Sequence, residues 1–218
     1  MHNKEHITGL ITENKLLPLF YNDSDEISIQ ILRALYDAGV RIVEYTNRGE
    51  NALHNFKLLK KFTEENLPGM HLGIGTIKTK KQAKKFIDAG CDFIVSPIIS
   101  KEIAEIADDK KLLWIPGCMT PTEIAQAEEL GAEIIKIFPG NTLGPAFIKS
   151  VKDVFPDLKF IPTGGVEPEE NNLREWFKAG VVAVGLGSKL ISTNMVNDKN
   201  YLGIRQLTEK LLQILKEI

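Results

Sequence analysis

A lysine stands in the middle of an apolar run, where a solvated side chain is not expected. Lys136 is flanked by Ile134 and Ile135 on one side and by Ile137 and Phe138 on the other. Lysine is rarely fully buried unless it is paired, and an apolar pocket disfavours its charged form. A neutral amine can attack a carbonyl carbon and form an imine, so Lys136 is a candidate nucleophile. The alternative is a lysine at a strand end that forms a salt bridge or reaches solvent.

Two further charged residues follow an earlier apolar run. Glu44 comes directly after Ile42 and Val43, and a carboxylate there could move the protons that imine chemistry requires. It could equally be a structural partner of a nearby cation. Arg48, four residues further along, has the planar fork that binds a carboxylate through parallel hydrogen bonds. The alternative for Arg48 is a solvated loop arginine.

Two glycine-rich segments form a third candidate. Pro162-Thr163-Gly164-Gly165 and Gly185-Leu186-Gly187-Ser188 each follow an apolar run. Their backbone amides, with a short helix expected to start near Ser188, would bind a phosphate group. The alternative is a pair of tight turns without a ligand.

These residues are placed by an alternation of short apolar runs and longer amphipathic stretches. Nearly continuous β-branched runs are typical of parallel strands buried on both faces. They predict strands at Leu16–Phe20, Arg41–Tyr45, His71–Ile74, Phe93–Val95, Leu112–Ile115, Glu133–Ile137, Lys159–Ile161 and Val181–Val184. Apolar residues at helical spacing predict helices at Ile27–Ala38, Ala52–Glu64, Lys80–Ala89, Pro121–Leu130 and Glu170–Ala179.

Glycines and terminal segments complete this pattern. Four helices are expected to close on a glycine in the left-handed conformation, namely Gly39, Gly90, Gly131 and Gly180. A further helix at Lys4–Glu13 is expected to cover the floor of the fold. The last helix is expected at Asn200–Ile218, with four leucines facing inward: Leu207, Leu211, Leu212 and Leu215.

Eight strand–helix units in 218 residues fit a doubly wound sheet or a closed barrel. The count of eight, and the absence of GxGxxG after the first strand, favour an α/β fold of the (β/α)8 TIM-barrel type. We expect an extra N-terminal helix and a single domain over residues 1–218. In such barrels the site lies at the carboxyl ends of the strands, which is where the residues above are placed.

Bulk composition excludes several functional classes. The formal net charge is -2 and the isoelectric point about 6.1, which argues against broad binding to nucleic acid or to an anionic membrane. No run approaches 18 apolar residues, and the segment Met1 to Glu13 lacks the features of a signal peptide. We therefore expect a cytoplasmic protein that binds a small molecule.

Metal and thiol chemistry are not expected either. The four histidines, His2, His6, His54 and His71, match no ligand spacing, so no metal is predicted. Cys91 and Cys118 are interpreted as buried free thiols, and Trp114 and Trp176 as packing residues.

The ordered set of strand-end residues resembles the 2-keto-3-deoxy-6-phosphogluconate (KDPG) aldolases, a family that includes enzymes acting on 4-hydroxy-2-oxoglutarate (KHG). The resemblance runs from about Leu16 to Ile191. The segments that carry it, each at a strand end, are Val43-Glu44-Tyr45-Thr46-Asn47-Arg48, Gly73-Ile74-Gly75-Thr76, Ser96-Pro97, Ile115-Pro116-Gly117, Lys136-Ile137-Phe138-Pro139, Pro162-Thr163-Gly164-Gly165 and Gly187-Ser188.

The resemblance implies a role for each matching position. Lys136 is implied as the Schiff-base lysine, Glu44 as the general acid/base, and Arg48 and Thr76 as contacts to the keto-acid carboxylate. Pro97 and Phe138 are implied as pocket walls. The phosphate contacts implied are Thr163, Gly164, Gly165, Gly187 and Ser188. Thr76 could alternatively cap the helix that follows it.

These roles imply a class I aldolase that reversibly cleaves KDPG to pyruvate and glyceraldehyde 3-phosphate, and that could also cleave KHG to pyruvate and glyoxylate. The resemblance implies a homotrimer of the Entner–Doudoroff route of carbohydrate metabolism, without a metal or other cofactor. Two alternatives are an isomerase or epimerase on a phosphate-binding barrel and a non-catalytic sugar-phosphate binding protein.

Four positions depart from the family's usual pattern. Asn47 and Gly49 stand where an aliphatic residue and Thr are frequent, Ile98 stands where Gly is frequent, and Gly140 where Ala is frequent. We expect these positions to bear on which aldehyde the protein releases.

Overall fold

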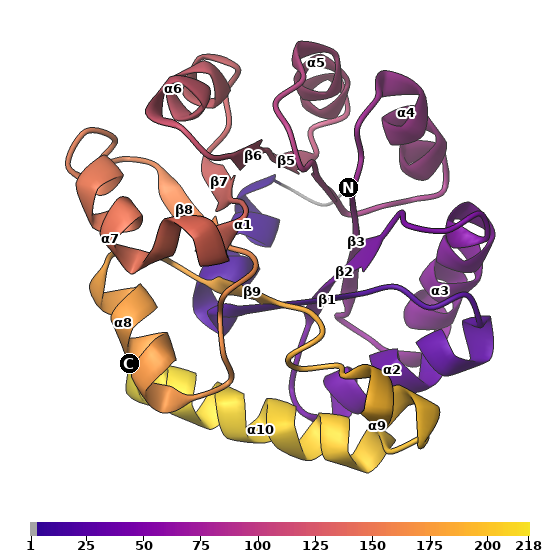
Figure 1. Cartoon of the computed structure of the whole chain (residues 1–218). Coiled ribbons are helices and arrows are strands. Elements are labelled where there is room, and N and C mark those ends of the chain that lie inside the picture. The colour runs from indigo at the N-terminus through magenta and orange to yellow at the C-terminus, as the bar shows by residue number, and fades with distance from the viewer. Residues whose placement is uncertain (1–3) are drawn as a thin grey trace.

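A curled parallel sheet with helices along its outer side forms the centre of the protein (Figure 1). The computed structural model describes residues 4–218. The strands within this range are β1 (Leu16–Phe20), β2 (Ile42–Thr46), β3 (His71–Gly75), β4 (Phe93–Val95), β5 (Leu113–Ile115), β6 (Gly117–Cys118), β7 (Ile134–Ile137), β8 (Lys159–Pro162) and β9 (Val184–Leu186).

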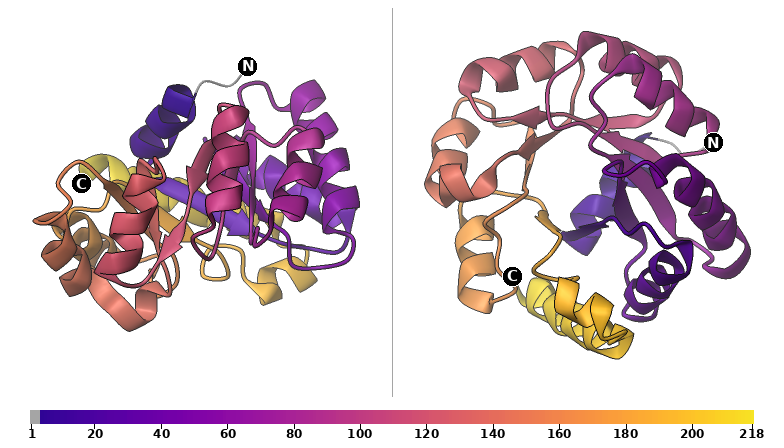
Figure 2. Two further views of the ribbon diagram at one scale, coloured as in Figure 1. Left: turned by 90° about the horizontal axis from the view of Figure 1, so that it is seen from above. Right: turned by 45° about the vertical axis from the view of Figure 1, so that its right-hand side comes forward.

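The helices follow the strands in alternation. They are α1 (Lys4–Asn14), α2 (Asp25–Asp37), α3 (Ala52–Asn66), α4 (Lys80–Asp88), α5 (Lys101–Asp109), α6 (Pro121–Glu129), α7 (Gly140–Lys152), α8 (Glu170–Lys178), α9 (Thr193–Asn197) and α10 (Tyr201–Glu217). Figure 2 (left) shows α1 at one end of the strands, apart from the surrounding helices. Since neighbouring strands pair in parallel, their carboxyl ends gather at the opposite end.

The strands form two hydrogen-bonded sheets. One has the order β5-β4-β3-β2-β1-β9 and the other β6-β7-β8. Pro116 separates β5 from β6, since it has no N–H to donate to a ladder. A single parallel bridge between Thr163 and Gly185 connects the second sheet to the first beyond β8.

Alternation along each strand sorts the apolar residues into two clusters. The outer cluster packs the helices on the sheet and contains Val43, Tyr45 and Ile135. The inner cluster lies on the concave side of the sheet and collects residues of several strands, among them Ile42 and Ile134. Ile7 and Ile11 of α1 belong to the inner cluster, so this helix covers the floor as predicted.

Most predicted elements are confirmed to within two residues. The four predicted helix-closing glycines, Gly39, Gly90, Gly131 and Gly180, all have positive φ angles. Helix α10 is confirmed, with Leu211 and Leu215 buried and Leu207 and Leu212 partly buried against the core.

The last predicted strand is wrong in its bounds. Val181 and Ala183 are buried as an apolar run should be, but the ladder to β1 begins only at Val184, which pairs with Leu16. Burial and strand pairing are different constraints, and the apolar pattern reports only burial. The strand therefore runs over Val184–Leu186 rather than Val181–Val184.

Two local predictions near helix starts are also wrong. Instead of a helix beginning near Ser188, a single turn forms, in which the amides of Leu190 and Ile191 both donate to the Gly187 carbonyl. Thr76 does not cap the following helix, because Thr79 accepts the hydrogen bond from the Gln82 amide.

The cysteines and tryptophans are packing residues, as predicted. Cys91 and Cys118 are buried and free, and burial raises the pKa of both thiols to about 12. Trp176 is fully buried, and Trp114 donates its indole N–H to Ser96 Oγ at 3.0 Å.

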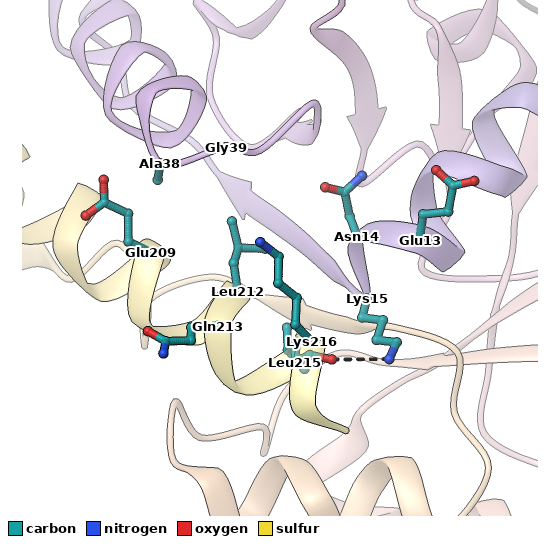
Figure 3. Close-up of a pocket in the computed structure, with 10 residues that line it drawn as sticks. All are labelled: Glu13, Asn14, Lys15, Ala38, Gly39, Glu209, Leu212, Gln213, Leu215 and Lys216. Atoms are coloured by element: carbon teal, nitrogen blue, oxygen red, sulfur yellow. Dashed lines mark hydrogen bonds between the residues drawn. The ribbon is translucent and has the colours of Figure 1, made fainter.

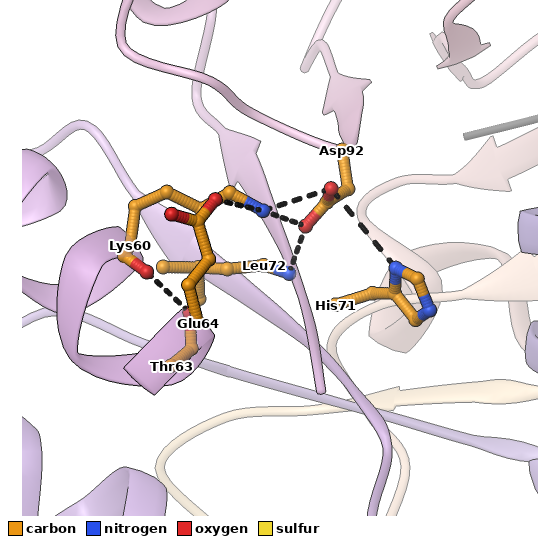
Figure 4. Close-up of polar contacts among 6 residues, drawn as sticks. All are labelled: Lys60, Thr63, Glu64, His71, Leu72 and Asp92. Atoms are coloured by element: carbon orange, nitrogen blue, oxygen red, sulfur yellow. Dashed lines mark hydrogen bonds and ion pairs between the residues drawn. The ribbon is translucent and has the colours of Figure 1, made fainter. Parts of the chain in front are cut away.

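A buried ion pair joins β3, β4 and α3 at the floor (Figure 4). Both carboxylate oxygens of Asp92 accept from Lys60 Nζ, at 2.9 and 2.8 Å, and one also accepts from the Leu72 amide at 2.6 Å. Burial alone would raise the pKa of Asp92, but hydrogen bonds from His71 and Lys60, with the Lys60 charge, lower it overall. The ionised carboxylate therefore stabilises the folded chain.

We predict that Asp92→Asn lowers the free energy of unfolding at pH 7 by about 3–5 kcal/mol, because Lys60 would lose its buried partner. The pKa of Asp92 is lowered on folding, so its contribution is present above the ordinary carboxyl value of 3.8 and is lost as the pH falls through the folded value. Urea unfolding at neutral and acidic pH measures this.

Glu64→Gln is the matched control, because Glu64 also pairs with Lys60 but is largely exposed. It should cost less than about 1 kcal/mol. Equal effects of the two substitutions at pH 7 would contradict the prediction.

Candidate active site

Lys136 and Glu44 lie on the inner face of the curled sheet because of strand alternation. Lys136 lies two residues after Ile134, and Glu44 two residues after Ile42, and both isoleucines belong to the inner cluster. Residues two apart in a strand point to the same side. The structure thus brings together two charged groups that lie on β2 and β7, far apart in the sequence.

The two charges are close but not hydrogen-bonded. Lys136 Nζ lies 3.7 Å from Glu44 Oε1, with side-chain exposures of 9% and 1%. Within the described residues, Glu44 Oε1 has no hydrogen-bond partner. A carboxylate oxygen without a donor keeps its lone pairs available to accept a hydrogen bond. Lys136 Nζ also lies 5.6 Å from the centroid of the Phe138 ring.

A missing side chain makes room for this carboxylate. A Cβ atom built on Gly75 would overlap Glu44 Oε1 and would lie 2.8 Å from Glu44 Cγ. Gly75 ends β3, the strand next to β2. The glycine at this position therefore allows Glu44 to lie over the end of the neighbouring strand.

A cavity of about 500 Å³ opens at the carboxyl ends of β1, β8 and β9. Most of the predicted substrate-binding residues line it, namely Arg48, Phe138, Thr163, Gly164, Gly165, Gly187 and Ser188. Both glycine-rich loops therefore line one cavity. Because Phe138 lines the cavity and its ring lies near Lys136 Nζ, it connects the cavity to the ion pair.

The first glycine-rich loop is tightly packed against the start of α7. Gly164 and Gly165 have φ angles of 85° and 73°, which L side chains rarely adopt. A Cβ on Gly165 would lie 2.5 Å from the Asn141 Cα. The Gly140 amide donates to the Thr163 carbonyl at 2.9 Å. This hydrogen bond fixes the position of the loop, in which Gly164 and Gly165 are exposed.

Two predicted residues lie elsewhere at the same end of the sheet. Thr76 follows β3 with a φ of 62°. Pro97 lies against Gly117, because a Cβ atom built on Gly117 would be 2.6 Å from the Pro97 carbonyl oxygen. Neither residue lines the 500 Å³ cavity.

The predictions from sequence missed the segment after β1 and the helix after β9. Tyr21, Asn22, Thr193 and Asn197 all line the cavity. Applying the rule of strand carboxyl ends to the first strand, Leu16–Phe20, would have found Tyr21 and Asn22. Thr193 and Asn197 belong to a five-residue helix, too short to give a periodic signal.

A larger cavity, of about 640 Å³, lies at the other end of the strands (Figure 3). It is bounded by the junction of α1 and β1, the end of α2, and α10. Lys15 in this cavity donates from Nζ to the Leu215 carbonyl at 3.2 Å. None of the residues that line this cavity lies at the carboxyl end of a strand. Because active sites of such folds lie at those ends, we do not assign the active site to this cavity, although it has the larger volume.

Residues 4–218 contain no group of three His, Cys, Asp or Glu side chains arranged to hold a metal ion. His2, one of the histidines considered from sequence, lies outside the described residues. Across the same range, no helix has the length and low charge content required to cross a bilayer.

Residues 7–207 match the family model "KDPG and KHG aldolase". Over 120 residues the chain is 41% identical to 2-dehydro-3-deoxy-6-phosphogalactonate aldolase of Escherichia coli K12, covering 55% of this chain and 58% of that one. It is 29% identical to 2-dehydro-3-deoxy-phosphogluconate aldolase of Pseudomonas aeruginosa, covering 98% and 96%. A solved KDPG aldolase of Legionella pneumophila, with pyruvate captured as a covalent carbinolamine, superposes with a TM-score of 0.84 at 25% identity, covering 93% and 96%.

We predict that Gly75→Ala destabilises the fold by about 1–3 kcal/mol, because the added methyl group would force Glu44 from its place. Gly9→Ala is the control, since a Cβ on Gly9 has no neighbour within 4 Å. Alanine is also more favourable than glycine inside a helix such as α1. It should leave stability unchanged or increase it. Thermal unfolding of the two variants measures the difference, and equal midpoints would be inconsistent with the close contact.

Proposed function

Because this chain belongs to the KDPG and KHG aldolase family, we propose that it cleaves KDPG to pyruvate and glyceraldehyde 3-phosphate through a Schiff base on Lys136. The observation that carries the proposal is the buried approach of Lys136 Nζ to Glu44 Oε1 at 3.7 Å. An amine and a carboxylate at this separation can act on the same substrate carbon.

The first half of the reaction converts the C2 carbonyl group of the substrate into a protonated imine, which can accept the electrons of the bond that later breaks. Glu44 takes a proton from the Lys136 ammonium, the neutral amine attacks the C2 carbonyl carbon, and a proton moves from nitrogen to oxygen to give a carbinolamine. Loss of water, assisted by proton transfer through Glu44, leaves a protonated imine. The positive nitrogen withdraws electrons from the C3–C4 bond.

Cleavage and release follow from the same two groups. Glu44 takes the proton of the C4 hydroxyl, directly or through water, while the C3–C4 bond breaks and its electron pair moves into an enamine. The aldehyde leaves, Glu44 or its water returns a proton to C3, and hydrolysis of the imine frees pyruvate. A carboxylate oxygen without a hydrogen-bond donor, as Glu44 Oε1 is among the described residues, suits repeated proton transfer.

Substrate binding is proposed for the remaining site residues. Arg48 and Thr76 bind the keto-acid carboxylate, and Pro97 and Phe138 form pocket walls. The phosphate is bound by Thr163, Gly164, Gly165, Gly187 and Ser188. Support comes from the shared cavity that unites Arg48, Phe138 and both loops. Since both glycine-rich loops line the cavity, the phosphorylated substrate is proposed as the main one and KHG as an additional one.

We further propose that the two sheets are parts of one closed (β/α)8 barrel with α1 as its extra N-terminal helix, within a single domain over residues 1–218. The bridge from Thr163 to Gly185 supports closure on one side. On the other side, β5 and β6 are separated by Pro116 alone, and the Lys136 amide donates to the Pro116 carbonyl at 2.8 Å. An isomerase or a non-catalytic binding protein has no comparable support.

We expect borohydride to trap pyruvate on Lys136. Mass spectrometry of peptides from the treated protein should find the reduced adduct there and none on Lys60, whose ammonium group is bound to Asp92. Lys136→Met should abolish trapping. Absence of an adduct at Lys136 in the unaltered protein would refute the proposal.

In a kinetic assay of KDPG cleavage, the variant Glu44→Gln tests proton transfer through Glu44. It should slow cleavage of KDPG by about 10²–10⁴-fold, the usual contribution of general acid–base catalysis. A rate within threefold of the unaltered protein would exclude Glu44 from this role.

The chain is also proposed to form a homotrimer, as its family resemblance implies. Light scattering should find a particle of three 24.3 kDa chains. A monomer at every concentration would contradict this.

A further inference from the structure

Tyr21 occupies the place of a side chain that is absent at Gly49. A Cβ atom built on Gly49 would overlap the Tyr21 hydroxyl and would lie 2.8 Å from Tyr21 Cε1. The backbone of Gly49 is not in the left-handed region, so the obstacle to a side chain there is Tyr21 itself.

The segment that carries Tyr21 is held rigidly. Its ring packs against Tyr45 with 5.6 Å between centroids. The next carbonyl, of Asn22, accepts from the Tyr45 hydroxyl at 2.9 Å and from Asn55 Nδ2 at 3.2 Å, and the Asp23 carbonyl accepts from Asn55 at 2.8 Å. A group fixed in this way loses little conformational freedom when it binds a ligand.

The order of the strands gives Tyr21 a defined position along the substrate. It follows β1, which lies between β2, the strand that leads to Arg48, and β9, which leads to Gly187 and Ser188. All four residues line the same cavity. If the carboxylate of the substrate lies near β2 and its phosphate near β9, the part of the chain between them passes Tyr21.

The Tyr21 hydroxyl is oriented for one kind of contact. It donates its proton to Asp23 Oδ1, so its oxygen retains lone pairs for a donor. Burial and the Asp23 carboxylate raise the pKa of Tyr21, so the phenol stays neutral. A neutral oxygen acceptor matches an alcohol group, which the carbon chain of a sugar phosphate carries.

We propose that Tyr21, accommodated by Gly49 and oriented by Asp23, is a specificity-determining residue that accepts a hydrogen bond from the hydroxyl next to the carbonyl in the aldehyde half of the substrate. The inference rests on the proposed aldolase function. It makes a hydroxylated aldehyde phosphate the preferred partner of pyruvate.

The test compares two aldehydes that differ only in this hydroxyl. Glyceraldehyde 3-phosphate carries it, and 3-oxopropyl phosphate lacks it while keeping the phosphate. Condensation of each with pyruvate is followed by pyruvate consumption. The measured quantity is the ratio of kcat/KM for the two aldehydes. Tyr21→Phe should lower this ratio about tenfold, as expected for loss of one hydrogen bond.

Tyr36→Phe is the matched control. Its hydroxyl donates to the Pro68 carbonyl on the surface of α2, outside the cavity, and the ratio should not change. A Tyr21→Phe variant with the unaltered ratio would overturn the inference.

A double substitution tests the contact with Gly49. Gly49→Ala should lower the ratio as Tyr21→Phe does, because the added methyl group would displace Tyr21. In a Tyr21→Val background, Gly49→Ala should have no further effect on the ratio. Additive effects in the double variant would overturn the role of Gly49.

Failure of the inference and failure of the proposed function have different signatures. Without trapping of pyruvate on Lys136, the aldolase function itself fails. With trapping, but with equal ratios in the unaltered protein and Tyr21→Phe, only the specificity role of Tyr21 fails.

Discussion

The proposed site depends on two opposite charges, Lys136 and Glu44, that are buried on the inner side of the strands. Transferring an isolated lysine or glutamate from water into such surroundings costs several kcal/mol per ion. Lys136 and Glu44, 3.7 Å apart, offset part of that cost for each other. The pairing requires that β2 and β7, which belong to the two different sheets, both direct these side chains inward. The cavity and both glycine-rich loops lie at the carboxyl ends of the strands, and Phe138, which lines the cavity, has its ring centroid 5.6 Å from Lys136 Nζ.

A second buried lysine–carboxylate pair shows how the same residue types can differ in capacity. Asp92 at the floor accepts from Lys60 through both oxygens and from a backbone amide. Glu44 at the mouth has an oxygen without a donor among the described residues. The Asp92 carboxylate is therefore fully hydrogen-bonded within the fold, whereas the Glu44 oxygen keeps lone pairs for the proton transfer that we propose for it.

Three glycines shape the carboxyl end of the strands by leaving room for neighbouring residues. Glu44 lies where a side chain on Gly75 would be, Tyr21 where one on Gly49 would be, and Asn141 where one on Gly165 would be. Each contact brings an atom of one element close to the backbone of another element. Such close packing tolerates little change in volume, so these glycines hold the geometry of the site.

The sequence by itself determined the periodic elements, the glycine helix ends and the candidate pair. Lys136 was found from its apolar neighbours alone, because a cation in such a run conflicts with the cost of burial. The sequence also placed both glycine-rich loops after strands, and in the structure they line one cavity.

Only the tertiary structure decided which of these residues meet. The 3.7 Å approach of Lys136 to Glu44 joins positions far apart in the chain, and no local pattern encodes the curvature that produces it. The same holds for the start of β9, since pairing with Leu16 rather than hydrophobicity sets where its ladder begins. Nothing in the sequence indicates that Tyr21 and Gly49 contact each other. Their relation exists only where two loops pack against each other, because a missing Cβ matters only when a neighbour fills its place.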